Sequence, residues 1–234
     1  MKIVVAVFFS ILISFQISFA QEIKLSFPDF SPWTYEEKGT FAGIGVEKVS
    51  LILNAMGVKY SFHSAPNYGK TLRELKVGKV DGFFLASENN ERNQVALFSK
   101  PVAINQWSWF FPKDSRLDPK SDVFKNTITV GTHLNANTQK WLLKKGYKAG
   151  PVYNKKVLPS MLLKSRRIDA VFLSSQVFHH DATPAFTKND YKEIVESKRN
   201  FGIYISKKYL KRYPDFMLLL NAEIEKLNDY LKPE

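Results

Sequence analysis

Two segments of the chain, LKVGKVDGFFLAS at residues 75–87 and LKSRRIDAVFLSS at residues 163–175, are alike in residue type at most positions. Each one ends a helical pattern, turns within a few residues and continues as a nearly unbroken apolar run. Such a run is typical of a strand that is buried on both faces of a parallel sheet. Asp81 and Asp169 occupy the same place in the two copies, where an aspartate usually binds backbone N–H groups. The repeat predicts two α/β units of one design.

The periodicity around each copy extends the repeat to the same order of elements: strand, helix, strand, helix, strand. In the first half the segments are 22–27, 45–57, 58–63, 68–78 and 80–86. In the second half they are 126–131, 137–146, 150–154, 157–166 and 168–174. Open α/β sheets bind ligands at the carboxyl ends of their strands. Because Ser87 and Ser175 stand at those ends, we expect them to face one cleft.

Two long extended runs, at 98–113 and 200–209, are the segments expected to cross between the units. Together with a C-terminal helix at 214–231 that returns to the first unit, they predict a hinge that lets two lobes close on a ligand. We expect lobe one to comprise 21–104 and 203–234, and lobe two to comprise 105–202. The alternative is a single fused sheet with ordinary loops.

The first twenty residues have the pattern of a secretory signal peptide. Lys2 provides a positive charge, residues 3–13 are apolar except for Ser10, and small residues at Ser18 and Ala20 suit a cleavage site. We expect cleavage near Ala20 and a periplasmic location; an uncleaved anchor is the alternative. The chain contains no cysteine, so its stability must come from packing without disulfides.

The formal net charge of +12 favours anionic partners. The basic residues are scattered and no nucleic-acid recognition motif accompanies them, so we expect no nucleic acid to bind. Four scattered histidines and the absence of a phosphate-binding loop predict neither a metal site nor a cofactor.

Three segments resemble the family 3 periplasmic solute-binding proteins, the type that serves ABC importers of polar amino acids. They are FSPWTYEEKGTFAGIGVEKV at 30–49, YGKTLRELKVGKVDGFFLASENNERNQVALFSKPV at 68–102 and TVGTHLNANTQKWL at 129–142. The second match is the most specific, because Arg92, Phe98, Ser99 and Pro101 follow in the family's order. The resemblance implies the two-lobe periplasmic binding protein fold of type II, an α/β fold with a ligand cleft between the lobes.

The resemblance also implies a ligand site. Phe30 and Tyr68 match the aromatic pair that sandwiches the ligand, and Arg92 matches the arginine that clamps its carboxylate. A guanidinium suits this role because it offers two parallel N–H donors. With the serines and asparagines of the strand-end loops, the expected ligand-binding residues are Phe30, Tyr68, Leu85, Ser87, Arg92, Asn135, Asn137, Ser174 and Ser175.

Ser174 departs from the family pattern, since amino-acid binders carry an aspartate there for the ligand's ammonium group. A buried ammonium without a partner is costly, so either another carboxylate replaces it or the ligand lacks the ammonium. Asp29, Glu47 and Glu88 are the candidate replacements. The sequence therefore predicts a small carboxylate-bearing solute, an amino acid or a related organic anion.

We expect a monomeric binding protein that closes on this solute and presents it to an inner-membrane ABC permease, and we expect no enzymatic activity. One alternative is a sensory subunit for a membrane receptor. Another is an enzyme of the dehydratase or lyase type on the same fold, which would need an acid or base such as Glu47, Glu88 or His133.

Overall fold

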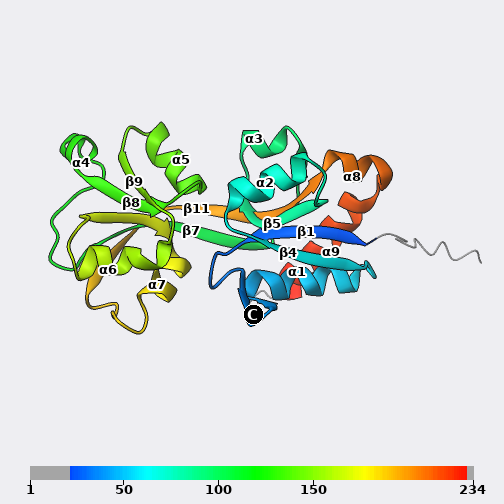
Figure 1. Cartoon of the computed structure of the whole chain (residues 1–234), viewed down its shortest axis with the longest axis horizontal. Helices are drawn as coiled ribbons and strands as arrows, with labels where there is room; N and C mark the ends of the chain where they lie inside the picture. The colour runs from blue at the N-terminus through cyan, green and yellow to red at the C-terminus, as the bar shows by residue number, and fades with distance from the viewer. Residues whose placement is uncertain (1–21, 231–234) are drawn as a thin grey trace, which may run out of the picture.

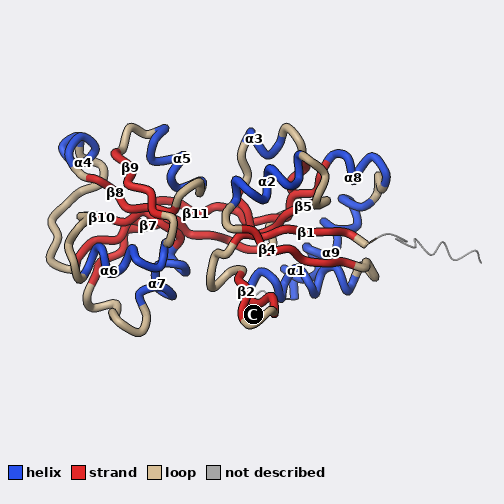
Figure 2. Tube along the Cα trace, in the orientation of Figure 1, coloured by secondary structure: helices blue, strands red, loops and turns tan. Residues whose placement is uncertain are grey.

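The computed structural model describes residues 22–230, and the predicted signal peptide at 1–20 lies outside them. Figure 1 shows an elongated molecule in which two groups of helices and strands lie side by side along the long axis. The helices cover both faces of a sheet that runs through both groups, as Figure 2 shows. None of the described helices combines the length and the apolar composition that crossing a membrane requires.

The first group has the predicted order of elements. They are β1 (Ile23–Pro28), α1 (Ile44–Ala55), β4 (Tyr60–Ala65), α2 (Tyr68–Lys76) and β5 (Gly82–Ser87), with a small hairpin of β2 (Tyr35–Glu37) and β3 (Thr40–Ala42). Strand β1 pairs in parallel with both β4 and β5. Gly78, at a φ of 76°, follows the end of α2 and donates to the Leu75 carbonyl, the left-handed stop that favours glycine.

The second group repeats this arrangement. Its elements are α4 (Asp122–Thr127), β8 (Thr129–His133), α5 (Asn137–Lys144), β9 (Lys148–Val152), the 3-10 turn Lys155–Val157, α6 (Leu158–Leu163), β10 (Ala170–Ser174) and α7 (Ser175–Ala182). Strand β8 pairs in parallel with both β9 and β10. The predicted strand at 126–131 begins later than expected, because α4 occupies residues up to Thr127.

Two long strands join the groups, β7 (Ala103–Pro112) and β11 (Tyr191–Ser206). They pair antiparallel along their length; β11 also pairs with β5, and β7 also pairs with β10. The described strands other than β2 and β3 therefore form one nine-stranded sheet in the order β4-β1-β5-β11-β7-β10-β8-β9, with β6 (Ala96–Phe98) beside β11. The two lobes and the fused sheet, which the sequence presented as alternatives, are both present.

The second crossing strand begins earlier in the chain than the sequence predicts. We expected it at residue 200, whereas β11 begins at Tyr191. The charged segment between these points forms a strand because it pairs with the aromatic strand β7, from Tyr191 opposite Pro112 to Asn200 opposite Ile104. Helices α3 (Asn90–Asn93), α8 (Lys207–Arg212) and α9 (Phe216–Tyr230) complete the chain, and α9 corresponds to the predicted C-terminal helix.

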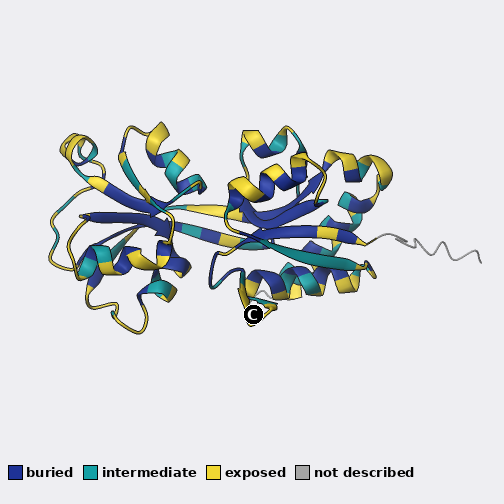
Figure 3. Cartoon of the chain, viewed as in Figure 1, coloured by how far each residue is buried: buried dark blue, intermediate teal, exposed yellow. Residues whose placement is uncertain are grey.

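The core is rich in aromatic rings, and Figure 3 shows buried strands inside each group; β5 and β10 are buried along their whole length, whereas the first half of β11 is partly exposed. In the first group Phe27 packs against Phe84 at a centroid distance of 5.3 Å. In the second group Trp109 packs against Phe172 at 4.5 Å. Asp81, at the turn of the first repeat copy, accepts the backbone N–H of Lys24 at 3.1 Å. This bond supports the expected structural role of that aspartate.

Candidate ligand-binding site

A small cavity lies where the two groups and both crossing strands meet. It measures about 20 Å³, which is room for about one water molecule. Its lining residues are Phe30, Tyr68, Ser87, Arg92, Asn105, Trp107, Ala136, Asn137, Thr138, Ser174 and Phe201. None of these is acidic. The cavity is therefore aromatic and polar, and Arg92 is its one charged lining residue.

Arg92 reaches the cavity from the short helix α3. The side chain of Asn89, just before this helix, accepts the backbone N–H of Arg92 at 2.9 Å. The Arg92 side chain is folded back, so that its Nη1 donates to the Ser87 carbonyl and its Cζ lies 4.9 Å from the centre of the Tyr68 ring. Only 3% of the residue is exposed. The turn after β5 thus holds the guanidinium inside the protein.

The charge of Arg92 has no carboxylate partner within residues 22–230. Burial lowers the pKa of its guanidinium from the usual value. The neighbouring Glu91 instead forms ion pairs with Lys140 at 2.7 Å and Lys76 at 3.6 Å. A buried cation with only a carbonyl and ring faces around it is incompletely compensated. An anion in the cavity would complete its coordination.

Tyr68 forms one wall of the cavity and is fixed at both ends. Its ring lies against the Arg92 guanidinium, and its hydroxyl donates to the Leu85 carbonyl. Burial raises the pKa of this hydroxyl, so it stays protonated at neutral pH. The Phe30 ring stands edge-on to Tyr68 at a centroid distance of 6.0 Å. The two rings make a rigid aromatic corner.

Asn137, the first residue of α5, connects the two groups across the cavity. Its Nδ2 donates to Ser87 Oγ at 2.7 Å, and its Oδ1 accepts from Asn89 Nδ2 at 2.9 Å. Lys140 on the same helix reaches Glu91 in the first group. The structure is therefore a closed arrangement, with polar contacts directly between the groups.

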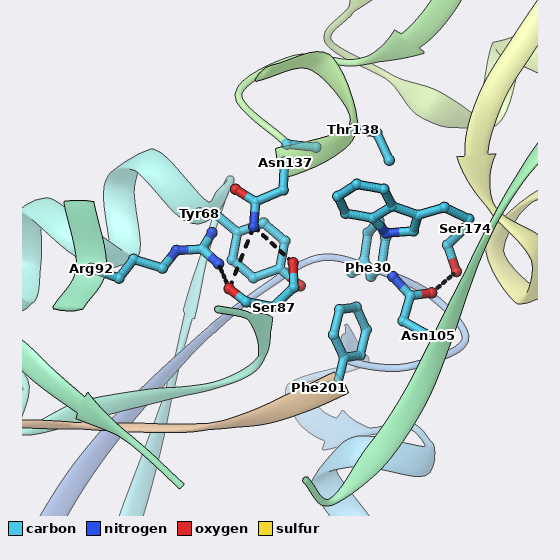
Figure 4. A pocket seen from close by; sticks show the side chains of 11 residues that line it. Phe30, Tyr68, Ser87, Arg92, Asn105, Asn137, Thr138, Ser174 and Phe201 are labelled. Atoms are coloured by element: carbon cyan, nitrogen blue, oxygen red, sulfur yellow. Dashed lines mark hydrogen bonds between the residues drawn. The ribbon is translucent and has the colours of Figure 1, made fainter. Parts of the chain in front are cut away.

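Ser174 lies on the opposite side of the cavity from Arg92, as Figure 4 shows. Its Oγ donates to Asn105 Oδ1 at 2.5 Å and accepts from Trp33 Nε1 at 3.4 Å. Asn105 comes from the crossing strand β7, whereas Trp33 comes from the loop after β1. All three residues are buried. The position where an amino-acid binder has a carboxylate thus holds a neutral hydrogen-bond chain.

Six of the nine predicted site residues line the cavity, namely Phe30, Tyr68, Ser87, Arg92, Asn137 and Ser174. Leu85 contributes its backbone carbonyl to Tyr68, and its side chain lies beside Gly45. Asn135 has a φ of 60° and borders the neighbouring groove with Lys140. Ser175 turns to Glu193, outside the cavity.

Five lining residues are absent from the predicted set, namely Asn105, Trp107, Ala136, Thr138 and Phe201. Asn105 and Trp107 are two residues apart on β7 and so point to the same face of the strand. A polar Asn alternating with aromatic residues on a predicted crossing strand is the signal that could have identified them. Phe201 lies on the partner strand β11, opposite Ala103, and sequence alone does not give that register.

Glu193 forms a second polar cluster beside the site, with Ser175 and His179. Burial opposes its charge, but hydrogen bonds from His179 and Ser175 outweigh this effect and lower the pKa of its carboxyl to about 2. Because this pKa lies below the ordinary value of 4.5, the ionised group stabilises the fold above about pH 4.5. That contribution is lost as the pH falls towards 2.

We expect Glu193→Gln to lower the free energy of unfolding at pH 7 by at most about 3 kcal/mol, the value of a 2.5-unit pKa difference. The difference from the wild-type protein should shrink as the pH falls from about 4.5 towards 2. Urea unfolding at pH 7, 4 and 3 measures it, with the exposed Glu47→Gln as the control. A deficit that is equal at all three pH values would show that the charge of Glu193 has no such role.

Comparison with known proteins shows that the fold is that of the two-lobe solute-binding proteins. The profile of the bacterial extracellular solute-binding proteins, family 3, matches residues 25–229. The chain belongs to this family. No curated protein compared with the chain matches it.

Three solved structures share the fold at low sequence identity. A histidine kinase sensor domain with similarity to periplasmic binding proteins is 16% identical, with a TM-score of 0.77 over 90% of this chain and 91% of that one. The arginine-, lysine-, histidine-binding protein ArtJ from Geobacillus stearothermophilus is 17% identical, with a TM-score of 0.73 over 90% of both chains. The ancestral amino acid-binding protein AncCDT-1, a precursor of cyclohexadienyl dehydratase, is 19% identical, with a TM-score of 0.72 over 89% of both. At these identities the likeness establishes the fold alone.

Proposed function

We propose that the protein is an exported, monomeric binding protein that encloses a small carboxylate-bearing solute between two lobes and presents it to an ABC permease. Lobe one would comprise 21–104 and 203–234, and lobe two 105–202. The observation that carries this proposal is the buried guanidinium of Arg92, which faces an aromatic cavity without a carboxylate partner in the described residues. A ligand carboxylate would accept two parallel hydrogen bonds from it.

The absence of acidic residues from the described cavity lining supports a solute without an ammonium group. Asp29 lies 4.0 Å from the buried Lys155. Glu47 is exposed on α1. Glu88 accepts a hydrogen bond from Asn93 at 2.9 Å. None of these three carboxylates lines the cavity, so the amino-acid form of the solute is disfavoured.

The same geometry favours binding over catalysis. The acids and bases that an enzyme could use, Glu47, Glu88 and His133, do not line the cavity. His133 is stacked on the Phe30 ring at a centroid distance of 6.2 Å. Burial, together with the nearby Lys155, lowers its pKa to about 4, so it is neutral at pH 7. We propose that the protein releases its solute unchanged.

Closure is the step that would communicate binding to the membrane partner. A ligand shifts an open–closed equilibrium only through contacts that it makes better in the closed form. Arg92 in one group and Asn137 in the other both line the cavity, so both would touch a solute once the cavity widens beyond its present size of about one water molecule. A sensory role uses the same closure. Crosslinking in the membrane distinguishes the two, since an importer subunit contacts a permease and a sensory subunit contacts a receptor.

We expect a small carboxylate to copurify with the protein and to raise its melting temperature when added back. Mass spectrometry of the denatured protein identifies the solute, and a thermal-shift screen of carboxylates ranks its analogues. Small-angle scattering should show a smaller radius of gyration with the solute than without it. If amines or neutral sugars stabilise the protein and carboxylates do not, the proposed function is wrong.

A further inference from the structure

The direction of one buried hydrogen-bond chain limits what the solute can be. An indole N–H can only donate, so Trp33 Nε1 must donate to Ser174 Oγ, which lies 3.4 Å away. The Ser174 hydroxyl donates its single proton to Asn105 Oδ1, at 2.5 Å. Asn105 therefore meets Ser174 through its amide oxygen.

This direction leaves the amide NH₂ group of Asn105 for the cavity. Figure 4 shows the oxygen of Asn105 towards Ser174 and its nitrogen turned the other way, towards the rings in the middle of the cavity. Asn105 is only 2% exposed. Within residues 22–230 its nitrogen makes no hydrogen bond, although a buried amide N–H ordinarily has a partner. The side chain is thus a buried donor that is aimed into the site.

Trp107, two residues further along β7, adds an aromatic side chain to the lining of the cavity. The wall opposite Arg92 therefore presents the Asn105 donor, and no lining residue carries a carboxylate. Its chemistry is complementary to an acceptor.

We infer that the solute carries one carboxylate for Arg92 and, in place of an ammonium group, an oxygen acceptor for the amide of Asn105. This inference rests on the proposed function. Two kinds of compound meet this requirement, 2-oxo acids and dicarboxylates. The keto oxygen of a 2-oxo acid and the second carboxylate of a dicarboxylate both accept hydrogen bonds from N–H donors. An ammonium group at this wall would face the amide N–H groups of Asn105. It would then be buried without a carboxylate partner, which is unfavourable.

Matched pairs of ligands with one carbon skeleton test the inference. Calorimetry at pH 7 would compare pyruvate with alanine, 2-oxoglutarate with glutamate, and phenylpyruvate with phenylalanine; succinate would represent the dicarboxylates. We expect an amino-free compound to bind at least tenfold more tightly than its amino partner. Tighter binding of the amino acids would overturn the inference and leave the proposed carboxylate binding intact. If no carboxylate binds, both are wrong.

Asn105→Asp tests the donor directly, because it replaces the NH₂ group by an oxygen of nearly the same size. We expect this variant to lose at least tenfold in affinity for the amino-free solute and to gain affinity for the matching amino acid. Asn54→Asp, on the exposed part of α1, adds the same charge away from the site and should change neither affinity.

Ser174→Ala provides the second test if Asn105→Asp does not fold. Without the serine proton, Asn105 can rotate and turn its oxygen towards the cavity. The ratio of the affinity for the amino-free ligand to the affinity for its amino partner should therefore fall at least threefold. A melting curve checks the fold of each variant. A preference that stays the same in every variant that folds would overturn the assigned role of Asn105.

Discussion

Arg92→Met is expected to weaken carboxylate binding by roughly 30-fold to several thousand-fold. Loss of one member of a buried, hydrogen-bonded charge pair costs about 2–5 kcal/mol, and each 1.4 kcal/mol corresponds to a factor of ten. Arg92→Lys retains the charge but removes the two parallel donors, so it should also bind weakly. Calorimetry with the copurified solute measures both effects, and the exposed Arg116→Met is the matched control.

The same variant should not destabilise the ligand-free protein. In the described residues the guanidinium of Arg92 has no carboxylate partner, and a buried charge of this kind can often be replaced by an apolar side chain at no cost in stability. We expect the melting temperature of ligand-free Arg92→Met to equal or exceed that of the wild-type protein. Normal carboxylate affinity in this variant would contradict the proposed site.

Gly45→Ala is expected to lower the free energy of unfolding by about 2 kcal/mol, as overpacking of a tight contact does. A Cβ at Gly45, at the start of α1, would lie 2.4 Å from Leu85 Cγ and 3.0 Å from the Trp33 carbonyl oxygen. Leu85 cannot move freely, because its φ is 51° and its carbonyl accepts the Tyr68 hydroxyl. The melting temperature should fall by roughly 4–8 °C.

A second substitution shows whether the crowding acts through Leu85. Leu85→Ala removes the atoms that the new methyl group would meet, so the double variant should lose less stability than the sum of the two single variants. Gly45→Ala should also weaken solute binding, because displacing Leu85 moves the carbonyl that holds Tyr68 in the cavity wall, and the double variant should restore that affinity. Strictly additive losses would mean that Gly45 is required for another reason.

The repeated segments made most of the fold predictable. Helical spacing and apolar runs are patterns among residues that are close in the sequence, so the sequence alone reveals them. The strands predicted at 80–86 and 168–174 are β5 and β10, whose ends lie within two residues of the predicted ends. The early start of β11 was not predictable in this way. Its first half is rich in charge and becomes a strand through pairing with β7, a contact between residues that are far apart in the sequence.

The site was predictable only in part, for a similar reason. The resemblance to the family pointed to Arg92, Phe30 and Tyr68, which lie in contiguous segments and line the cavity. Asn105 was missed because the face on which a strand residue points depends on the register of its neighbours. Ser174 and Ser175 are adjacent, yet one ends β10 at the cavity and the other begins α7 and turns to Glu193.

The continuous pairing of β7 with β11 has a mechanical consequence. Because both strands run from one group into the other, the groups cannot swing apart on two independent flexible linkers. Any widening of the cleft has to bend or twist a two-stranded ribbon whose ladder stays intact. Within this ribbon the register of β11 shifts between Val195 and Ser197, and such a bulge bends a strand locally. The stiffness of the ribbon therefore limits how far the two groups can separate.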